Sequence, residues 1–362
     1  MQTSVTIPAT PKELTPRFFS DVLGCEVASI SEHRIGEDES FAGGGLFRIK
    51  ITYMSDSQAG PASVVAKFSP TDAAMRLRFA TANKREIDFY AESSRETELP
   101  TPKYYFGAFD PVTGSSILII DDLAEFRTVG ILEACTPDEA ASVIDALARI
   151  HATFWNKPIV ASLSGTDLLQ EFDFRTAWST YREKFSTLLP HYDIPESFFE
   201  LCQFIADNDQ VIFGYLWNLQ PLTLVHRDTH VDNILFGDSE DVEPAILLDW
   251  QLVGKGKGAF DLAYFLISSL EPGLRREIEA PMLARYHDAL VRFGVDDYSL
   301  ERCRVDFLVS VVGKIYITVV ATSFLDNTTP HKIAYREADI TRLLAFISDH
   351  AISHKTFSFM LD

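Results

Sequence analysis

Three oxygen-bearing side chains between positions 228 and 249 have the types and the spacing that phosphoryl transfer requires. Asp228 closely follows an apolar run, and Asn233 lies five residues further along the chain. Asp249 ends a second apolar run. Carboxylate and amide oxygens are the hard ligands that Mg²⁺ prefers, so Asn233 and Asp249 are candidate metal ligands. Asp228 is then a separate carboxylate that orients an attacking hydroxyl group and accepts its proton.

Short strands are expected to hold these side chains in place. Three compact apolar runs predict them: Leu222–Val225, Ile234–Phe236 and Ala245–Leu248. The polar stretch Gly237–Glu243 separates the last two runs and predicts the turn of a small hairpin. We therefore expect Asp228, Asn233 and Asp249 to emerge from adjacent strand ends.

The first third of the chain is rich in strand signals. Alternating or β-branched segments predict strands over the ranges Leu46–Tyr53, Ala62–Phe68 and Ser116–Ile120. Helices are expected at Thr15–Leu23, where Pro16 falls in the first turn and Gly24 follows the end, and around Arg78–Glu92.

The rest of the chain is predicted to be mainly helical. Thr136-Pro137-Asp138-Glu139 reads as a capping box that starts a long helix. Strands followed by helices indicate an α+β fold with two lobes and a hinge near Ile120–Glu125. We assign residues 1–122 to an N-terminal nucleotide-binding lobe and residues 123–362 to a C-terminal catalytic and substrate-binding lobe.

Composition excludes several classes of protein. The chain has 32 Lys and Arg against 52 Asp and Glu, a formal charge of −20, so neither nucleic acid nor an anionic membrane is an expected partner. The apolar stretch Phe307–Leu325 is interrupted by Lys314 and predicts a buried helix, not a membrane span. The first residues show no signal-peptide pattern, and four scattered cysteines form no CxxC pair, so a cytoplasmic protein is expected. No motif specifies an oligomeric state.

The motif HxDxxxxN, followed by an apolar strand and Leu248-Asp249-Trp250, resembles the aminoglycoside phosphotransferase/choline kinase superfamily. The segment GAFDLAYFL, which contains Asp261, and the helix LARIHATFW are similar to the ecdysteroid-kinase-like branch. The resemblance implies a protein-kinase-like two-lobed fold that uses ATP and Mg²⁺ to phosphorylate a hydroxyl group of a small acceptor. It implies that Asp228 is the catalytic base, that His226 orients the catalytic loop, and that Asp261 supports that loop.

The same resemblance places the nucleotide-binding residues in the first lobe. Lys67 ends a β-branched strand and suits contact with the phosphates, with Glu86 on the next helix as its partner. The triplet Gly43, Gly44 and Gly45 offers backbone N–H groups to the phosphates, or is simply a flexible turn. The hinge residues Ile120, Asp121 and Leu123 are expected to offer backbone groups to adenine.

Other functions remain open from the sequence. Alternate residues of one segment have the spacing of metal ligands in a hydrolase: His226, Asp228, His230 and Asp232. A non-catalytic nucleotide-binding, pseudokinase-like protein is a second alternative, although the Lys and both Asp residues that such proteins lose are present. A protein kinase is less compatible, because Asp261 lies only 12 positions after Asp249 and leaves little room for a peptide-binding segment.

Three further features have a functional and a structural interpretation. Arg227 stands where small-molecule kinases commonly have Gly. Lys255 and Lys257 lie in a Gly-rich loop. They are either solvated loop residues or contacts to an anionic group of a ligand. An aromatic series either lines an acceptor pocket or belongs to the core: Phe172, Phe174, Trp178, Tyr181 and Phe185.

Overall fold

The computed structural model describes residues 7–36, 45–55, 60–93, 99–162, 173–188, 194–238, 243–324 and 329–361. The chain forms two compact units. The first comprises Met1–Phe126 together with Leu248–Val253, and the second comprises Arg127–Leu247 and Gly254–Asp362. A short segment far along the chain thus belongs to the first unit.

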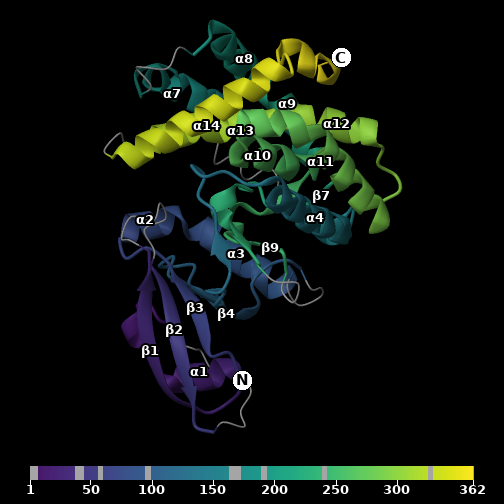
Figure 1. Cartoon of the computed structure of the whole chain (residues 1–362). Helices are drawn as coiled ribbons and strands as arrows, with labels where there is room; N and C mark the ends of the chain where they lie inside the picture. Colours follow the sequence, from purple (N-terminus) through teal and green to yellow (C-terminus); the bar gives the residue numbers. More distant parts are fainter. Residues whose placement is uncertain are drawn as a thin grey trace. The chain divides into compact units, whose positions relative to one another are not determined.

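The first unit is built on a five-stranded antiparallel sheet with the order β1-β2-β3-β5-β4 (Figure 1). Its strands are β1 (Val27–Ile35), β2 (Leu46–Tyr53), β3 (Ser63–Phe68), β4 (Tyr104–Phe109) and β5 (Ser116–Asp121). The register pairs Lys67 of β3 with Leu46 on one side and Leu118 on the other. The strands predicted at β2, β3 and β5 are confirmed, and the α+β fold class with an antiparallel N-terminal sheet is correct.

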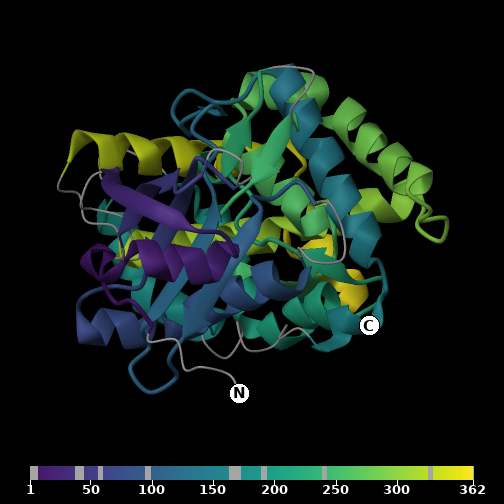
Figure 2. The same ribbon diagram turned by 90° about the horizontal axis from the view of Figure 1, so that it is seen from below.

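An apolar layer lies between this sheet and helix α1 (Pro16–Leu23), which Figure 2 shows beside the purple first strand. Phe19 of α1 is fully buried among Ile49, Val64 and other inward-facing strand residues. Thr15 caps the helix by accepting a hydrogen bond from the Phe18 N–H, and Gly24 ends it with a φ of 70°. A positive φ favours glycine, so the sequence fixes where this helix stops.

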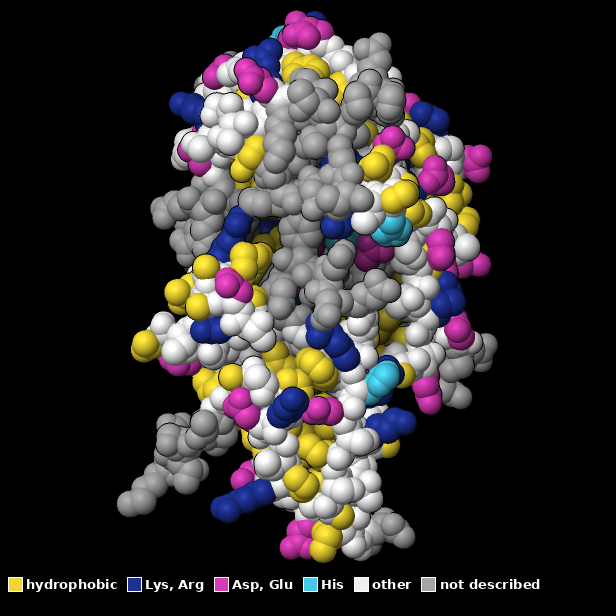
Figure 3. All heavy atoms as spheres, turned by 90° about the vertical axis from the view of Figure 1, so that its left-hand side faces the viewer, with side chains coloured by type: hydrophobic (Ala, Val, Ile, Leu, Met, Phe, Trp, Pro, Cys, Tyr) yellow, Lys and Arg dark blue, Asp and Glu magenta, His cyan; other side chains and the backbone are white. Residues whose placement is uncertain are grey.

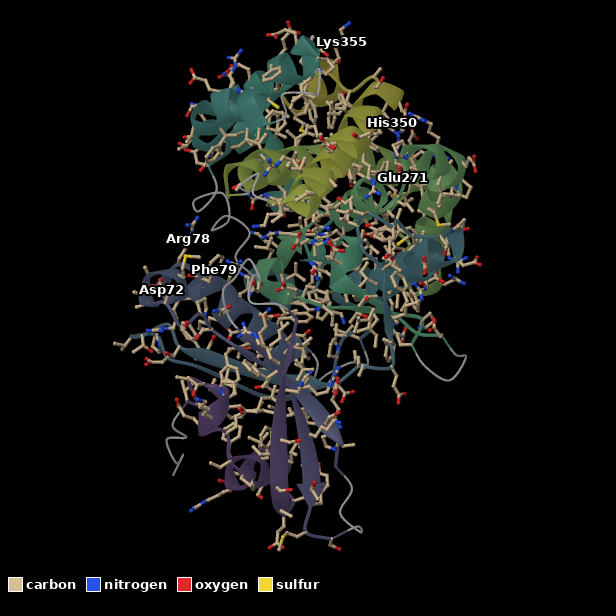
Figure 4. All side chains as sticks on the ribbon, turned by 60° about the vertical axis from the view of Figure 1, so that its left-hand side comes forward. Asp72, Arg78, Phe79, Glu271, His350 and Lys355 are labelled. Carbon is tan, nitrogen blue, oxygen red and sulfur yellow. The ribbon has the colours of Figure 1, made fainter. Side chains whose placement is uncertain are left out.

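Two more helices and a short 3₁₀ turn, η1 (Pro11–Glu13), complete the N-terminal part of the unit. Helix α2 (Ala73–Arg78) is capped by Asp72, whose carboxylate accepts the Met75 N–H at 2.9 Å (Figure 4). Phe79 ends α2, and α3 (Ala80–Ser93) follows directly. This second helix packs against β4 and β5 and carries Glu86.

The segment Leu248–Val253 contains a 3₁₀ turn, η3 (Trp250–Leu252), that packs on α3. The indole ring of Trp250 is fully buried and stacks on Phe89, with the ring centroids 4.0 Å apart and an interplanar angle of 13°. The Gln251 side-chain amide donates to Asn83 Oδ1 at 3.0 Å, and the backbone carbonyl of Gln251 accepts from the Arg85 guanidinium at 3.0 Å. These contacts anchor the residues that follow Asp249.

The second unit is mainly helical. Its helices are α4 (Pro137–Phe154), α5 (Pro158–Ser162), α7 (Phe174–Leu188), α8 (Glu196–Asp207), α9 (Asp209–Asn218), α10 (Ala259–Ser269), α11 (Pro272–Arg292), α12 (Leu300–Val309), α13 (Val311–Phe324) and α14 (Pro330–Asp349), followed by η4 (His354–Met360). The predicted capping box is confirmed, because Thr136 and Glu139 bond to each other's backbone N–H.

Short strands in this unit flank the candidate site segment from His226 to Asn233. They are β6 (Arg127–Thr128), β7 (Thr223–Val225), β8 (Ile234–Phe236), β9 (Ala245–Leu247) and β10 (Gly254–Gly256), with the turn η2 (Val231–Asn233) before β8. Strand β8 pairs with β6 and β9, and β7 pairs with β10. The predicted hairpin of Ile234–Phe236 with the following apolar strand is confirmed.

Helix α10 is the centre of the helical core. All eleven of its residues are buried, and it contacts α4, α11, α12, α13 and α14 (Figure 1). A helix that is apolar on every side is stable only when other helices surround it. The position of α10 matters for the site because it begins a few residues after the Gly254–Gly256 strand and carries Asp261.

The apolar stretch Phe307–Leu325 is not one helix as predicted. The chain breaks at Ser310, whose hydroxyl donates to the Asp306 carbonyl, so the stretch belongs to α12 and α13. Most of it is buried, as expected. Across the described residues, no helix combines the length and the apolar character needed to cross a bilayer.

Charged residues join α11 to α14 at their ends, where Figure 4 labels two of them. Glu271, at the start of α11, accepts a hydrogen bond from Arg342 at 2.5 Å. His350, at the end of α14, lies 2.8 Å from Glu279. On the face drawn in Figure 3, Lys and Arg side chains are interspersed with Asp and Glu and form no continuous basic band in the described part of that surface.

Candidate active-site residues

Lys67 of β3 makes a charged cluster with two carboxylates in the first unit. Its ammonium nitrogen lies 2.9 Å from Glu86 Oε2 and 3.1 Å from Asp249 Oδ1. Burial alone would lower the pKa of Lys67, but Asp249 and Glu86 outweigh it and raise that pKa above its usual value. The lysine therefore stays cationic, as a residue that binds phosphate must.

Glu86 is positioned by α3 and is only 5% exposed. The pKa of Glu86 is raised to about 7. Burial is the main cause, Asp249 adds to it, and Lys67 opposes both. A buried carboxylate with one cationic partner holds that partner in a narrow range of positions. The contact predicted from the sequence between Lys67 and Glu86 is present.

Asp249 follows strand β9 and has a left-handed backbone, with φ 59° and ψ 68°. Aspartate tolerates this conformation better than most residues, because its short side chain bonds locally. The side chain is 41% exposed, and one of its oxygens, Oδ1, is paired with Lys67. The carboxylate is thus held by its neighbours and still accessible to a ligand.

The predicted hinge and glycine residues also belong to the first unit. Asp121 accepts a hydrogen bond from the Tyr105 hydroxyl at 3.0 Å, and Ile120 and Leu123 are half-buried. Gly45 precedes β2, and its carbonyl accepts from Phe68. Gly43 and Gly44 lie outside the described residues.

The loop that begins at His226 in the second unit is held by Asp261 of α10. One oxygen of this buried carboxylate accepts the His226 N–H at 2.6 Å, and the other accepts the Arg227 N–H at 2.8 Å. His151 of α4 lies 3.2 Å from Asp261 and 2.7 Å from the Tyr286 hydroxyl. A buried charge needs such a complete set of donors, so this network fixes the loop backbone.

Asp228 projects from this loop, and each of its carboxylate oxygens accepts one hydrogen bond. The Asn233 amide donates to Oδ2 at 3.1 Å, and the Tyr264 hydroxyl donates to Oδ1 at 3.1 Å. The backbone N–H of Asp228 donates to His226 Nδ1 at 3.2 Å. The carboxylate is therefore both oriented and partly exposed.

The charge state of Asp228 is set by its neighbours. Burial would raise the pKa of its carboxyl, but His230 and His226 outweigh burial and hold that pKa well below its usual range. Burial also lowers the pKa of His230, yet Asp228 and Asp232 raise it to about 10. Asp228 is consequently an anion at neutral pH, able to accept a hydrogen bond from an alcohol.

Asn233 has the features of a metal ligand. Its amide nitrogen donates to the Asp228 carbonyl at 2.9 Å as well as to the carboxylate. Its amide oxygen receives no hydrogen bond from the residues that the structure describes. The next residue, Ile234, pairs with Leu247 across β8 and β9.

A hydrolase-type metal cluster is not supported. In the described ranges, no group of three or more His, Cys, Asp or Glu side chains is arranged to hold a metal ion. Asp232 instead accepts the Ile131 N–H at 2.9 Å, which ties the loop to the segment after β6. Mg²⁺ bound to a nucleotide needs only one or two protein oxygens, because phosphates and water complete its coordination.

Lys257 and most of the aromatic series have structural roles. Lys257 is 1% exposed, and its ammonium donates to the Leu219 carbonyl at 2.8 Å, so it is neither solvated nor available to a phosphate. Phe174, Trp178 and Phe185 are buried in the helical core. Phe172 lies outside the described residues.

Two residues of the hydrogen-bond network around this loop, Tyr264 and His151, were not predicted to belong to it. Tyr264 lies three positions after Asp261, a spacing that places both on one face of a helix, and this signal could have identified it. The pairing of His151 with Asp261 could not be predicted from the sequence, because the two residues are 110 positions apart.

Several solved structures with this fold are named as small-molecule kinases. A choline/ethanolamine kinase family protein from Mesorhizobium loti is 14% identical and matches with a TM-score of 0.53 over 92% of this chain and 93% of that chain. Choline kinase from Cryptosporidium parvum is 10% identical, with a TM-score of 0.51 over 98% and 97%. The GDP complex of aminoglycoside 2′-phosphotransferase-IIIa is 13% identical, with a TM-score of 0.51 over 88% and 93%. At these identities the likeness establishes the fold, and it confirms the predicted protein-kinase-like architecture.

The family assignment comes from the sequence. The profile of the family DUF1679, described as "Uncharacterized oxidoreductase dhs-27", matches residues 63–356. This range covers most of the chain, which therefore belongs to that family. No curated protein matches the chain by sequence.

Proposed function

We propose that this protein transfers the γ-phosphoryl group of ATP to a hydroxyl group of a small molecule. The proposal rests on one observation: the ammonium group of Lys67 contacts both Glu86 and Asp249. These three residues come from three separate segments. The sequence predicts Lys67 as a phosphate contact, Glu86 as its partner and Asp249 as a metal ligand. In kinases a lysine paired with a glutamate contacts the phosphates of ATP, and a nearby aspartate binds Mg²⁺.

Mg²⁺ fits the oxygen atoms that the chain offers. We assign its protein ligands to the Asn233 amide oxygen, which has no described donor, and to the exposed carboxylate of Asp249. When bound, the ion would neutralise charge on the phosphates. Neither residue is a soft or nitrogen ligand, so the pair favours Mg²⁺ over Zn²⁺.

Asp228 then acts on the acceptor. Its carboxylate is anionic and held by two hydrogen bonds, so it can align an alcohol and accept the proton as the bond to phosphorus forms. His226 keeps the loop in shape through its contact with the Asp228 N–H. Most of the rate gain in such reactions comes from positioning and charge stabilisation.

A small acceptor is favoured over a protein. Only 12 positions separate Asp249 from Asp261, and the loop between them is pinned by backbone pairing of β10 with β7. An extended peptide-binding segment has no room there. The fold's solved relatives named as choline and aminoglycoside kinases act on small molecules, which supports the same class here.

The family description names an oxidoreductase, and the residues of this chain do not favour that chemistry. Its sequence contains no Gly-x-Gly-x-x-Gly motif. The described strand pairs are all antiparallel, whereas dinucleotide-binding folds use a parallel sheet. Phosphotransfer accounts for the charged residues, and hydride transfer leaves them unexplained.

The direct test is a screen of small alcohols for acceptor-stimulated ADP release from Mg²⁺-ATP. The screen includes amino alcohols, sugars, sterol alcohols and aminoglycosides, with each hit verified by mass spectrometry of the phosphorylated product. Asp228→Ala should keep ATP affinity within a few-fold and lose turnover by about 10²–10⁴-fold. Asp249→Ala should also weaken nucleotide binding, and only when Mg²⁺ is present.

Two results would contradict the proposal. Full phosphotransfer by Asp228→Ala on a verified acceptor would show that the roles are assigned wrongly. Failure of the wild-type protein to bind Mg²⁺-ATP would remove phosphotransfer altogether. ATP binding without any acceptor turnover, across the whole screen, would favour the non-catalytic nucleotide-binding alternative.

A further inference from the structure

We propose that Tyr264 is a positioning residue for Asp228, fixing the carboxylate in the orientation that receives the acceptor hydroxyl. This inference rests on the proposed function, because it assigns Tyr264 a role in that same reaction. The contact itself is independent of any function. The Tyr264 hydroxyl lies 3.1 Å from Asp228 Oδ1 and is part of the second unit with it.

The position of Tyr264 follows from the helix that carries it. Asp261 and Tyr264 are three residues apart on α10, so they lie on the same face, one turn from each other. Asp261 holds the loop backbone at His226 and Arg227, and Tyr264 holds the side chain that the loop presents. A single helical turn therefore sets both the path of the loop and the direction of its reactive group.

Tyr264 can only be the donor in this bond. Burial raises the pKa of its phenol well above the ordinary value, and the Asp228 charge raises it further, so the phenol keeps its proton. The ring is 3% exposed and is packed inside the helical core, which limits its rotation. A rigid neutral donor facing an anion makes a strong, directional hydrogen bond.

Hydrogen bonds to both oxygens define the plane of the Asp228 carboxylate. The Asn233 amide holds Oδ2, and at Oδ1 the His230 ring nitrogen is 3.6 Å away, beyond hydrogen-bond distance. The Tyr264 hydroxyl fixes Oδ1 as well, and the remaining lone pairs then point in set directions. Reacting atoms must meet within a narrow range of distance and angle, so a loosely held base loses rate.

Lys314, the only charge in the apolar stretch Phe307–Leu325, lies behind this tyrosine. Its ammonium is 4.9 Å from the centroid of the Tyr264 ring and is paired with Asp339. The side chain of Lys314 is only 4% exposed, so its charge is weakly screened. The attraction between this cation and the face of the ring helps to hold Tyr264 in place behind Asp228.

The test has one arm that requires no acceptor. Replacing Tyr264 with 3-fluorotyrosine places a single ¹⁹F nucleus beside the hydroxyl group. Its NMR signal should move when Asp228→Asn exchanges the anionic acceptor for a neutral one. The matched control is Asp145→Asn, which removes an exposed carboxylate paired with Arg285 and should leave the signal unchanged. An unmoved signal in Asp228→Asn would overturn the inference.

The second arm measures rates with an acceptor found by the screen. Tyr264→Phe keeps the ring and should lower kcat by about 10–100-fold, while the KM for ATP changes less than two-fold. The matched control is Tyr298→Phe, because the Tyr298 hydroxyl donates to the buried Asp306 at 3.0 Å and removal of it costs similar stability. Tyr298→Phe should retain wild-type kcat.

The outcomes separate this inference from the proposed function. A ¹⁹F response together with a loss of kcat specific to Tyr264→Phe supports the positioning role. Unchanged kcat in Tyr264→Phe overturns that role even if the hydrogen bond is seen. If the wild-type protein phosphorylates nothing, the proposed function fails and the catalytic role fails with it, whereas the NMR arm still decides whether the bond exists.

Discussion

The guanidinium carbon of Arg227 lies 4.3 Å from the centre of the Trp217 ring, a cation–π contact inside the second unit. The same side chain donates to the Lys255 carbonyl at 2.5 Å. Arg227 has a φ of 69°, in the region that favours glycine. The stacking and the hydrogen bond offset the cost of the backbone conformation.

This geometry predicts an order of stability among variants of Arg227. Arg227→Gly loses the ring contact and the hydrogen bond but relieves the backbone, so it should be destabilised by about 1–3 kcal/mol. Arg227→Ala loses the same contacts and keeps the strained φ, so it should be about 1 kcal/mol less stable again. Urea denaturation of the three proteins checks the order, and an Ala variant more stable than the Gly variant would contradict it.

Removal of the Lys67 charge should weaken nucleotide binding. Lys67→Met loses charge-assisted hydrogen bonds to phosphate, which corresponds to an increase of about 10–100-fold in the Kd for Mg²⁺-ATP. Glu86→Gln should have a smaller effect, because it loosens Lys67 without removing it. Titration calorimetry measures both. Lys84→Met, which removes an exposed lysine of α3 paired with Asp88, is the control and should bind as the wild type does.

Gly258 has no space for a methyl group. A Cβ atom there would lie 2.3 Å from the Tyr286 hydroxyl and 2.9 Å from His151 Nδ1. Gly258→Ala should therefore destabilise the protein by about 1–3 kcal/mol and lower kcat, because it displaces the residues that hold Asp261. Thermal unfolding and turnover check both effects.

The control for this substitution is another glycine. Gly214 lies inside α9, and a Cβ atom there meets nothing within 4 Å. Gly214→Ala should stabilise the protein by about 0.5–1 kcal/mol, since alanine favours a helix over glycine. Equal effects at the two positions would show that steric contact at Gly258 is not the cause.

Lys257 predicts a dependence of stability on pH. Burial lowers the pKa of this lysine to about 8 in the folded protein, although Asp306 opposes the shift. Between pH 8 and the ordinary lysine pKa of about 10.4, the unfolded chain therefore binds the proton and the folded chain releases it. The free energy of unfolding therefore rises with pH between about 8 and 10.4 as a result of Lys257. Below pH 8 both states bind the proton, and Lys257 makes no pH-dependent contribution.

The comparison of wild type with Lys257→Met isolates this contribution. The difference in unfolding free energy should shift in favour of the wild type as the pH rises from 8 to 10, by at most about 1.4 kcal/mol per pH unit. Urea denaturation at several pH values measures it. A difference that stays constant would show that Lys257 is charged throughout, held by Asp306.

The sequence predicted those parts of the fold that have a local signal. Strand β2 was predicted with its observed bounds, because its residues alternate, and α4 was predicted from its capping box. Strand β1 was missed. It is an edge strand whose residues are mostly exposed, and it carries Glu32, His33 and Arg34, so no apolar pattern marks it.

Features that depend on distant contacts could not be predicted. The burial of Lys257 needs the Leu219 carbonyl and Asp306, and neither is near it in sequence. The break at Ser310 falls inside an apolar stretch that reads as continuous. The candidate site residues were identified from spacing, whereas the contact of Tyr264 with Asp228 depends on how α10 packs.

The segment Leu248–Val253 has a consequence for biosynthesis. A ribosome adding about 5–20 residues per second needs on the order of ten seconds to extend the chain from the end of the N-terminal segment to this one. During that interval Phe89 lacks its stacking partner Trp250, and Lys67 lacks Asp249. The nascent first unit therefore cannot complete its fold during this interval. Part of its apolar surface stays uncovered until residues 248–253 leave the ribosome.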